Sequence, residues 1–190
     1  MLFAAHEHMA YDLGILAPQE TATQADSPPE PWHRVTDQPQ TVVLEKNDIR
    51  LGVVIFPARP ETPQRAFQET ASRAQRLHQT CDLVLGVSSW GKQLEHDFLV
   101  QAPGAVDILQ GSGSGGPLPF RLPNDRKTVW VRPYSEGKTV QRLDILDLPR
   151  DTPTTWNKGR NIALRLVSLN EDMPENAAVA QTLREAGAKE

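Results

Sequence analysis

Two short segments hold most of the residues whose types could do chemistry, and the first is the glycine-rich run at residues 111–116 (GSGSGG). Glycine-rich turns expose backbone N–H groups to anions, so weak phosphate or nucleotide binding is one interpretation. The run lacks the Lys-Ser/Thr pair that follows a nucleotide-binding loop, and Pro117 removes the N–H with which a helix would begin. The pattern therefore favours a plain flexible turn and leaves weak anion binding open.

The second segment is residues 86–91 (GVSSWG), which nearly matches the G-x-S-x-G elbow of serine hydrolases. Its closing glycine is displaced by one position. A catalytic triad would also need an acid and then a histidine downstream, and His96 is the last histidine of the chain. The residues therefore argue against a serine hydrolase.

The histidines and the single cysteine do not form a metal-binding pattern. His6 and His8 stand two positions apart on an expected helix, where such positions do not face each other. The HExxH zinc motif does not occur. Cys81 by itself excludes an internal disulfide and a thiolate metal cluster. No metal site is predicted from the residues.

The elements that must position these segments alternate along the chain. Apolar runs predict strands at residues 41–45, 49–56, 83–87, 106–109, 128–132, 140–146 and 162–169. Helical spacing predicts helices at residues 1–16, 62–79, 93–101 and 174–186. The last three strands are expected to be antiparallel. Strands that alternate with helices and are followed by hairpins imply a mixed α/β fold.

Composition narrows the class of protein. A chain of 190 residues is long enough for one domain with a core, so we expect a single domain over 1–190, with a proline-rich surface loop at residues 24–40. A formal charge of −4 argues against nucleic acid as a partner. No apolar run approaches the roughly 20 residues that a membrane-spanning helix needs.

The order of these motifs resembles the catalytic domain of calcineurin-like metallophosphoesterases, in the branch of bacterial 5'-nucleotidases and UDP-sugar hydrolases. That family has LSHLG after one strand, GGHSH after the next, and an earlier YDxxxLGNHE motif. The corresponding segments here are residues 87–91 (VSSWG), 110–114 (QGSGS) and 11–20 (YDLGILAPQE). The two earliest family motifs, DxH and GD, have no counterpart. The resemblance covers the chain from about residue 10 to its end.

The resemblance implies a site for two divalent metals, but other residues stand at its ligand positions. Ser89, Ser112 and Ser114 replace imidazoles, while Pro18 and Gln19 replace an asparagine and a histidine. Serine hydroxyls stay protonated near neutral pH and bind such ions weakly, and a glutamine offers only a neutral amide. We therefore expect no dimetal site and no cofactor.

The expected function is that of a degenerate 5'-nucleotidase-like domain without phosphoester hydrolysis, acting as a binding or scaffolding module. Its weak ligand-binding positions would be those of the former active-site loops, Gln19, Ser88, Ser89, Trp90, Gly111, Ser112, Gly113 and Ser114. Phosphate or a nucleotide is the expected ligand, and Trp90 is expected at the rim of the former site, filling the volume left by the metals.

Two alternatives stay open. The chain could be a nucleotide or sugar-phosphate hydrolase completed by a missing N-terminal half or a partner subunit. Glu20, Asp107 and Asp125 would then be the local carboxylates to test. It could also be a structural remnant with no selected activity. The sequence therefore leaves open whether the chain is an enzyme.

The resemblance also implies a particular packing problem. The fold would be the second half of an α/β/β/α sandwich with mixed sheets and a C-terminal helix. An apolar strand edge near residues 41–56 would then lack its usual neighbours and would invite association. We expect an exposed apolar patch there, and a missing half, a second subunit or self-association as the partner. The compartment stays open, because the family is largely exported and this chain starts without the features of a secretory signal.

Overall fold

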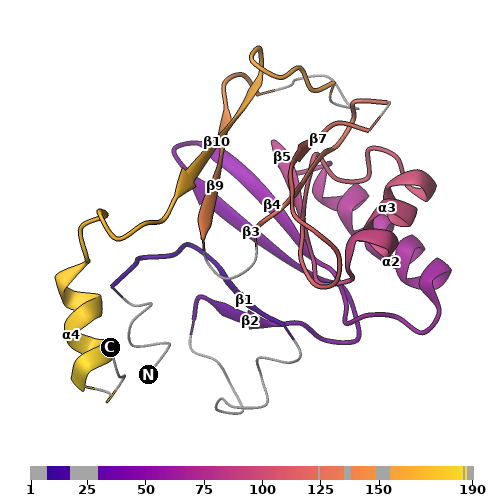
Figure 1. Ribbon diagram of the computed structural model, residues 1–190. Helices are drawn as coiled ribbons and strands as arrows, with labels where there is room; N and C mark the ends of the chain where they lie inside the picture. Colours follow the sequence, from indigo (N-terminus) through magenta and orange to yellow (C-terminus); the bar gives the residue numbers. More distant parts are fainter. Residues whose placement is uncertain are drawn as a thin grey trace. The chain divides into compact units, whose positions relative to one another are not determined.

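The computed structural model describes residues 8–17, 30–123, 125–134, 138–148, 155–185 and 187 (Figure 1). The chain divides into two compact units, residues 1–34 together with 169–190, and residues 35–168. The single domain expected from the sequence stays a prediction. Within the described ranges, none of the helices combines the length and the apolar character needed to cross a bilayer.

A six-stranded sheet is the framework of the larger unit and confirms the expected mixed α/β class. Its strand order is β3-β4-β5-β6-β8-β7, with parallel pairing from β4 to β8 and an antiparallel strand at each edge. The strands are β3 (Gln40–Lys46), β4 (Ile49–Ile55), β5 (Leu83–Ser88), β6 (Ile108–Gly111), β7 (Leu118–Arg121) and β8 (Val129–Arg132).

Two helices cover one face of this sheet, which we call the helix face (Figure 1). They are α2 (Pro63–Leu77) and α3 (Lys92–Gln101), and both confirm the helices expected from the apolar spacing. Phe67 and Ala74 of α2 and Phe98 of α3 are buried against Val54 and Leu109 of the sheet. Buried apolar area of this kind stabilises the fold by roughly 25 cal/mol per Å².

A two-stranded antiparallel hairpin lies on the opposite face, which we call the open face (Figure 1). It consists of β9 (Thr139–Ile145) and β10 (Ile162–Ser168), as the sequence predicts for these two strands. Leu143 and Ile145 pack against a second core cluster that contains Ile108, Trp156 and Ile162. The same strands therefore contribute alternate residues to two separate cores.

Strand β3 forms one edge of the sheet and joins β4 through a tight turn. Asn47 and Asp48 both have positive φ, 52° and 62°. A two-residue hairpin turn needs these values to match the right-handed twist of the strands that it joins. Val43 is 41% exposed and Ile49 is 40% exposed. Apolar side chains are thus exposed at the edge near residues 41–56, while the partner expected there stays a prediction.

Two strands of the larger unit differ from the sequence-based prediction. Strand β8 pairs in parallel with β6, and not as part of an antiparallel set. Strand β7 was not expected at all, because Pro117 and Pro119 interrupt its apolar pattern. Proline cannot donate to a sheet ladder and is tolerated mainly at an edge, which is where β7 lies.

The smaller unit contains the parallel strands β1 (Gly14–Leu16) and β2 (Trp32–Arg34) and the helix α4 (Ala177–Glu185). Strand β1 lies within the range 1–16, where the sequence predicts a helix, so that prediction is wrong for these residues. Strand β2 lies within the range 24–40, where the sequence predicts a loop. Gly14 is the physical reason, because its missing side chain leaves room for the Trp32 ring and its N–H donates to the Pro31 carbonyl. The expected closing helix is confirmed, with Val179 and Leu183 half-buried.

Candidate functional site

The loops that follow β5 and β6 lie against each other at the carboxyl ends of these strands. The Ser112 amide donates to the Ser88 carbonyl at 2.7 Å, and the Gly91 amide donates to the Ser112 carbonyl at 3.1 Å. The Lys92 amide reaches the Ser114 carbonyl at 2.9 Å. Residues from both predicted segments are therefore brought together, whereas Gln19 lies outside the described residues.

Two serine hydroxyls of these loops, those of Ser88 and Ser112, take part in internal hydrogen bonds. Ser88 is buried, and its Oγ accepts a hydrogen bond from the Trp90 amide at 3.1 Å. Ser112 Oγ donates to the Ser88 carbonyl at 2.9 Å. The Ser114 side chain occupies the space that a side chain on Gly91 would need. The Ser112 hydroxyl therefore links one loop to the other, whereas the Ser88 hydroxyl bonds within its own loop.

A buried ion pair lies beneath the 111–116 loop. Arg132, at the end of β8, has a side chain that is 2% exposed, and the Glu95 side chain of α3 is fully buried. Arg132 Nη1 lies 2.5 Å from Glu95 Oε2. Arg132 Nη2 donates to the carbonyls of Gly113 at 3.0 Å and Ser114 at 2.9 Å. One guanidinium thus holds the loop by its carbonyl oxygens while a carboxylate neutralises its charge.

The Glu95 carboxylate has further partners. Trp130 Nε1 donates to Oε2 at 3.0 Å, and the Ser112 amide donates to Oε1 at 3.2 Å. Burial raises the pKa of Glu95 above its ordinary value, and the hydrogen bond and charge of Arg132 oppose that rise. A side chain at Gly111 would overlap the carboxylate, so glycine is required there for the strand end to approach it.

Both charged residues of this network are absent from the site residues predicted from the sequence. The position of each within an apolar pattern could have indicated it. Glu95 falls three and four positions before Phe98 and Leu99, on the apolar stripe of α3, and Arg132 ends a strand whose residues are all buried. Opposite charges at two positions that both belong to the core would have suggested a pair.

Trp90 does not lie at a rim, contrary to the sequence-based expectation. It is 1% exposed and belongs to the core of the helix face. Its ring centroid lies 4.8 Å from that of Phe56 and 5.3 Å from that of Phe67. Its Nε1 donates to the Pro57 carbonyl at 2.7 Å. An indole is buried readily when its single donor finds an acceptor, and here that acceptor lies in the loop after β4.

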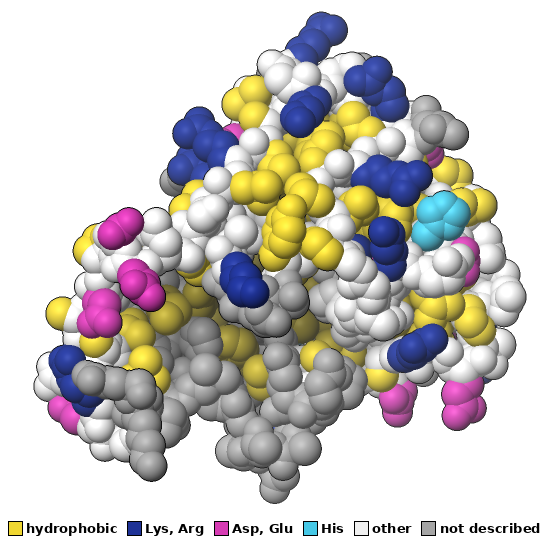
Figure 2. Space-filling model, in the orientation of Figure 1, with side chains coloured by type: hydrophobic (Ala, Val, Ile, Leu, Met, Phe, Trp, Pro, Cys, Tyr) yellow, Lys and Arg dark blue, Asp and Glu magenta, His cyan; other side chains and the backbone are white. Residues whose placement is uncertain are grey.

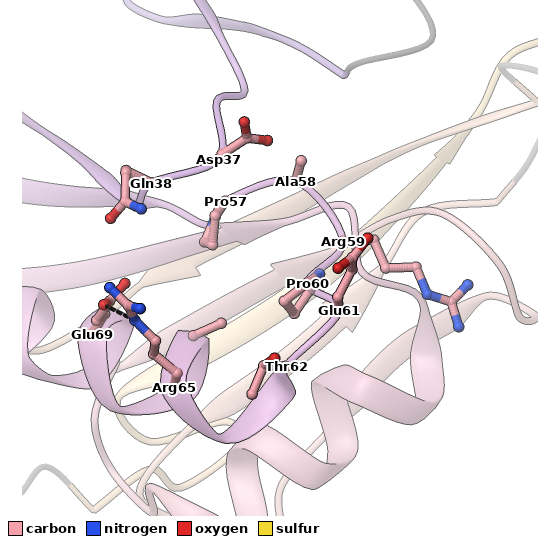
Figure 3. Close-up of a pocket in the computed structure, with 11 residues that line it drawn as sticks. Asp37, Gln38, Pro57, Ala58, Arg59, Pro60, Glu61, Thr62, Arg65 and Glu69 are labelled. Atoms are coloured by element: carbon pink, nitrogen blue, oxygen red, sulfur yellow. Dashed lines mark hydrogen bonds and ion pairs between the residues drawn. The ribbon is translucent and has the colours of Figure 1, made fainter.

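A polar pocket of about 420 Å³ lies beside that β4 loop. Figure 3 shows Asp37 and Gln38 on one side of it and Arg65 and Glu69 on another. Arg65 Nε lies 2.8 Å from Glu69 Oε1. Carboxylates and guanidinium groups both line the pocket, so its charge does not select one class of ligand.

The carboxylates named for the alternative hydrolase are not gathered at these loops. Asp107 precedes β6 and Asp125 precedes β8, so both lie at the amino ends of their strands. Asp107 Oδ2 accepts a hydrogen bond from the Val84 amide at 2.7 Å, and Asp125 Oδ1 accepts one from the Lys127 amide at 3.2 Å. Glu20 lies outside the described residues.

The residues present do not fit a pair of divalent metals. Such ions require carboxylates and neutral imidazoles, whereas Ser89, Ser112 and Ser114 offer hydroxyls, and that of Ser112 already donates to the Ser88 carbonyl. The carboxylate of Glu95 is paired with Arg132. Among the described residues, no three His, Cys, Asp or Glu side chains gather in a way that could hold a metal ion.

Comparison with known proteins adds little to this geometry. No family model matches the chain, and no curated protein matches it. One similar solved structure is that of a hypothetical protein from Thermus thermophilus, with a TM-score of 0.48 and 18% sequence identity. The match covers 66% of this chain and 54% of that one, so the chain spans about half the length of the protein that it resembles.

Proposed function

We propose that this chain is a noncatalytic binding or scaffolding module built on a degenerate metallophosphoesterase-like fold. The observation that supports it best is the buried Arg132 guanidinium. It binds the carbonyls of Gly113 and Ser114, in the loop that the resemblance aligns with the family's histidine-rich motif. A guanidinium that is paired with a buried carboxylate thus lies directly beneath that loop.

Electrostatics explains why this arrangement disfavours dimetal hydrolysis. The reaction needs two close cations that share and activate a water molecule. Glu95, the carboxylate that could offset added charge, is already paired with Arg132.

The exposed part of the 111–116 loop is where we expect the predicted phosphate or nucleotide to bind. Ser112, Gly113 and Ser114 are exposed, and Lys92, the first residue of α3, packs against Gly115. Exposed backbone N–H groups beside a lysine favour an anion. Because Arg132 is turned toward carbonyls inside the protein, we expect this binding to be weak.

Metal content and turnover test the noncatalytic half of the proposal. The purified chain is incubated with Mn²⁺, desalted and analysed for bound metal, and p-nitrophenyl phosphate hydrolysis is measured in parallel. We expect no stoichiometric metal and no turnover above buffer. Stoichiometric metal with turnover that disappears in a Ser89→Ala/Ser114→Ala variant would overturn the proposal. Turnover that this variant retains would indicate a contaminating phosphatase.

Thermal unfolding tests the binding half. Melting temperatures are compared with and without inorganic phosphate, AMP and UDP-glucose. A ligand at about 100 times its Kd stabilises the folded state by about 2.7 kcal/mol, which raises Tm by roughly 5–10 °C for a chain of this size. We expect a rise that a Lys92→Ala variant reduces. A flat response to all three compounds would leave scaffolding as the function.

A further inference from the structure

The two edge strands of the six-stranded sheet are built differently. Strand β7 contains Pro119 and pairs with β8 in an irregular register, and both features disfavour the pairing of a further strand. Strand β3 contains no proline, and its register with β4 runs without a bulge from Gln40 to Lys46. Among the described residues, β4 is the one strand that pairs with β3. The β3 edge is therefore open to a further strand.

The backbone groups of three residues of β3 point away from the sheet. The Asp82 amide, just before β5, donates to the Arg50 carbonyl at 2.9 Å, so Arg50 directs its backbone toward β5. Glu45 lies opposite Arg50 in the antiparallel pair of β3 and β4. Opposite residues in such a pair either exchange hydrogen bonds or point away from each other, in alternation along the strands. Glu45 therefore directs its N–H and C=O groups outward, and so do Val43 and Thr41, two and four positions earlier.

We propose that β3 pairs in antiparallel fashion with β3 of a second copy of this chain, in a register centred on Val43. Thr41 then lies opposite Glu45 of the second copy, so all three outward-pointing residues of each copy can exchange hydrogen bonds. Moving the centre by one residue in either direction brings Pro39 or Asn47 opposite one of them. Proline has no N–H, and Asn47 belongs to the turn and has positive φ. The strand is thus complementary to itself in the Val43 register.

The side chains also fit this register. Glu45 lies opposite a threonine, and Lys46 lies opposite Gln40 of the second copy, so like charges do not face each other. A register centred on Glu45 would instead place two carboxylates opposite each other. Val42 lies opposite Leu44 of the second copy, and both side chains are half-buried in the single chain. Charge and hydrophobicity therefore favour a second copy of this chain as the occupant of the edge.

The pairing also extends an apolar surface. An apolar groove of about 510 Å³ lies between β9 and the open face, and Leu51 of β4 lines it. Leu44 lies opposite Leu51, so its side chain points to the same face. Pairing of two β3 strands continues this face across the dyad and removes Val42 and Leu44 from water.

The expected dimer is weak. Strand β3 has seven residues, whereas a standard interface has roughly 20–30 on each side. We therefore expect a Kd on the order of 10 μM. The inference goes beyond the function proposed above, because it concerns the sheet edge and not the loops after β5 and β6.

Sedimentation equilibrium of the full chain between about 1 and 500 μM, a range that brackets the expected Kd, tests the pairing. Val43→Pro removes the central N–H, which points away from β4, and should weaken dimerisation at least tenfold. Val43→Thr keeps the N–H and a β-branched side chain, and should leave dimerisation unchanged within about twofold. Circular dichroism melts confirm that each variant is folded.

The charge at position 41 tests the register, and decides the matter if Val43→Pro does not fold. Thr41→Lys places an ammonium group opposite Glu45 of the second copy. It should strengthen dimerisation by about twofold to thirtyfold, because the dyad contains two such pairs. Thr41→Glu should weaken dimerisation by a similar factor, and about 1 M salt should reduce both effects.

Three results would overturn the proposal. The first is a chain that stays monomeric at the highest of these concentrations. The second is a dimer that the folded Val43→Pro variant leaves intact, and the third is an equal or reversed effect of Thr41→Lys and Thr41→Glu. None of them depends on metal content, turnover or ligand binding, so failure of this inference is distinguishable from failure of the proposed function.

Discussion

The two faces of the six-stranded sheet are made by alternate residues of the same strands, yet they are covered differently. On the helix face, Trp90, Phe98 and Trp130 are each at most 1% exposed. On the open face, Leu51 and Leu85 remain half-buried beside the groove. The face drawn in Figure 2 shows hydrophobic side chains gathered near its middle, with Lys and Arg side chains around them.

The difference lies in the elements that cover each face. Two helices bring aromatic side chains and a carboxylate to the helix face, where Glu95 and Trp130 hydrogen-bond to each other. A two-stranded hairpin is narrower than the six-stranded sheet it covers. Buried polar atoms without a partner among the described residues occur on both sides, Thr70 Oγ1 on the helix face and Thr139 Oγ1 and Trp156 Nε1 on the open face. A closely packed face supports the fold, whereas a narrow cover leaves a groove beside it.

The largest effect is expected from breaking the buried ion pair of the helix face. Arg132→Met leaves Glu95 buried without its cation, which should lower the free energy of unfolding by about 3–5 kcal/mol in urea titrations. The double variant Glu95→Leu/Arg132→Met removes both charges and should be more stable than the Arg132→Met variant. A loss of less than about 1 kcal/mol in the single variant would contradict this role of the pair.

The packing of the two faces can be compared directly through two leucines on neighbouring strands. Leu109 points to the helix face and is fully buried, while Leu85 points to the open face and is half-buried. Leu109→Ala should cost about 3 kcal/mol, because it leaves a cavity in a packed core. Leu85→Ala should cost about 1 kcal/mol, since part of its side chain already contacts solvent. Equal losses in chemical denaturation would show that both faces are equally packed.

Two of the fully buried tryptophans, Trp90 and Trp156, belong to the cores on opposite faces and allow the effect of an indole hydrogen bond to be compared. Trp90→Phe removes the donor to the buried Pro57 carbonyl, whereas Trp156 Nε1 has no acceptor among the described residues. We expect Trp90→Phe to destabilise the protein by about 1 kcal/mol more than Trp156→Phe. The measurement is the midpoint of urea unfolding followed by far-ultraviolet circular dichroism. The reverse order would indicate that Trp156 Nε1 has a partner.

The smallest effect concerns pH and Glu95. Because burial raises its pKa in the folded state, the folded protein holds this proton more tightly than the unfolded chain does. The stability contributed by this group is fully present below about pH 4.5, the ordinary value, and is lost as pH rises through the raised pKa. Relative to Glu95→Gln, the native protein should therefore lose stability as pH rises. A relative gain would mean that Arg132 outweighs burial.

Much of the framework could be predicted from the sequence, because its signals are local. The apolar run of β4 and the spacing of Phe67 and Ala74 in α2 repeat over a few residues, and both elements were expected. The meeting of the two loops also follows, since they end neighbouring parallel strands. Strands β1 and β2 could not be predicted in this way. Gly14 pairs with Trp32 across a long stretch of chain, and nothing near either residue indicates the pairing.

The sequence by itself determined which functional groups the loops can offer, because Ser89, Ser112 and Ser114 carry hydroxyls wherever the chain places them. Only the tertiary structure decided that Glu95 and Arg132 form a buried pair, because they are 37 positions apart and meet only when α3 packs on the helix face. The groove on the open face was decided in the same way. The exposure of an apolar residue such as Leu85 depends on how wide the hairpin is that packs over it. That width follows from how the elements pack, and a local sequence pattern does not contain it.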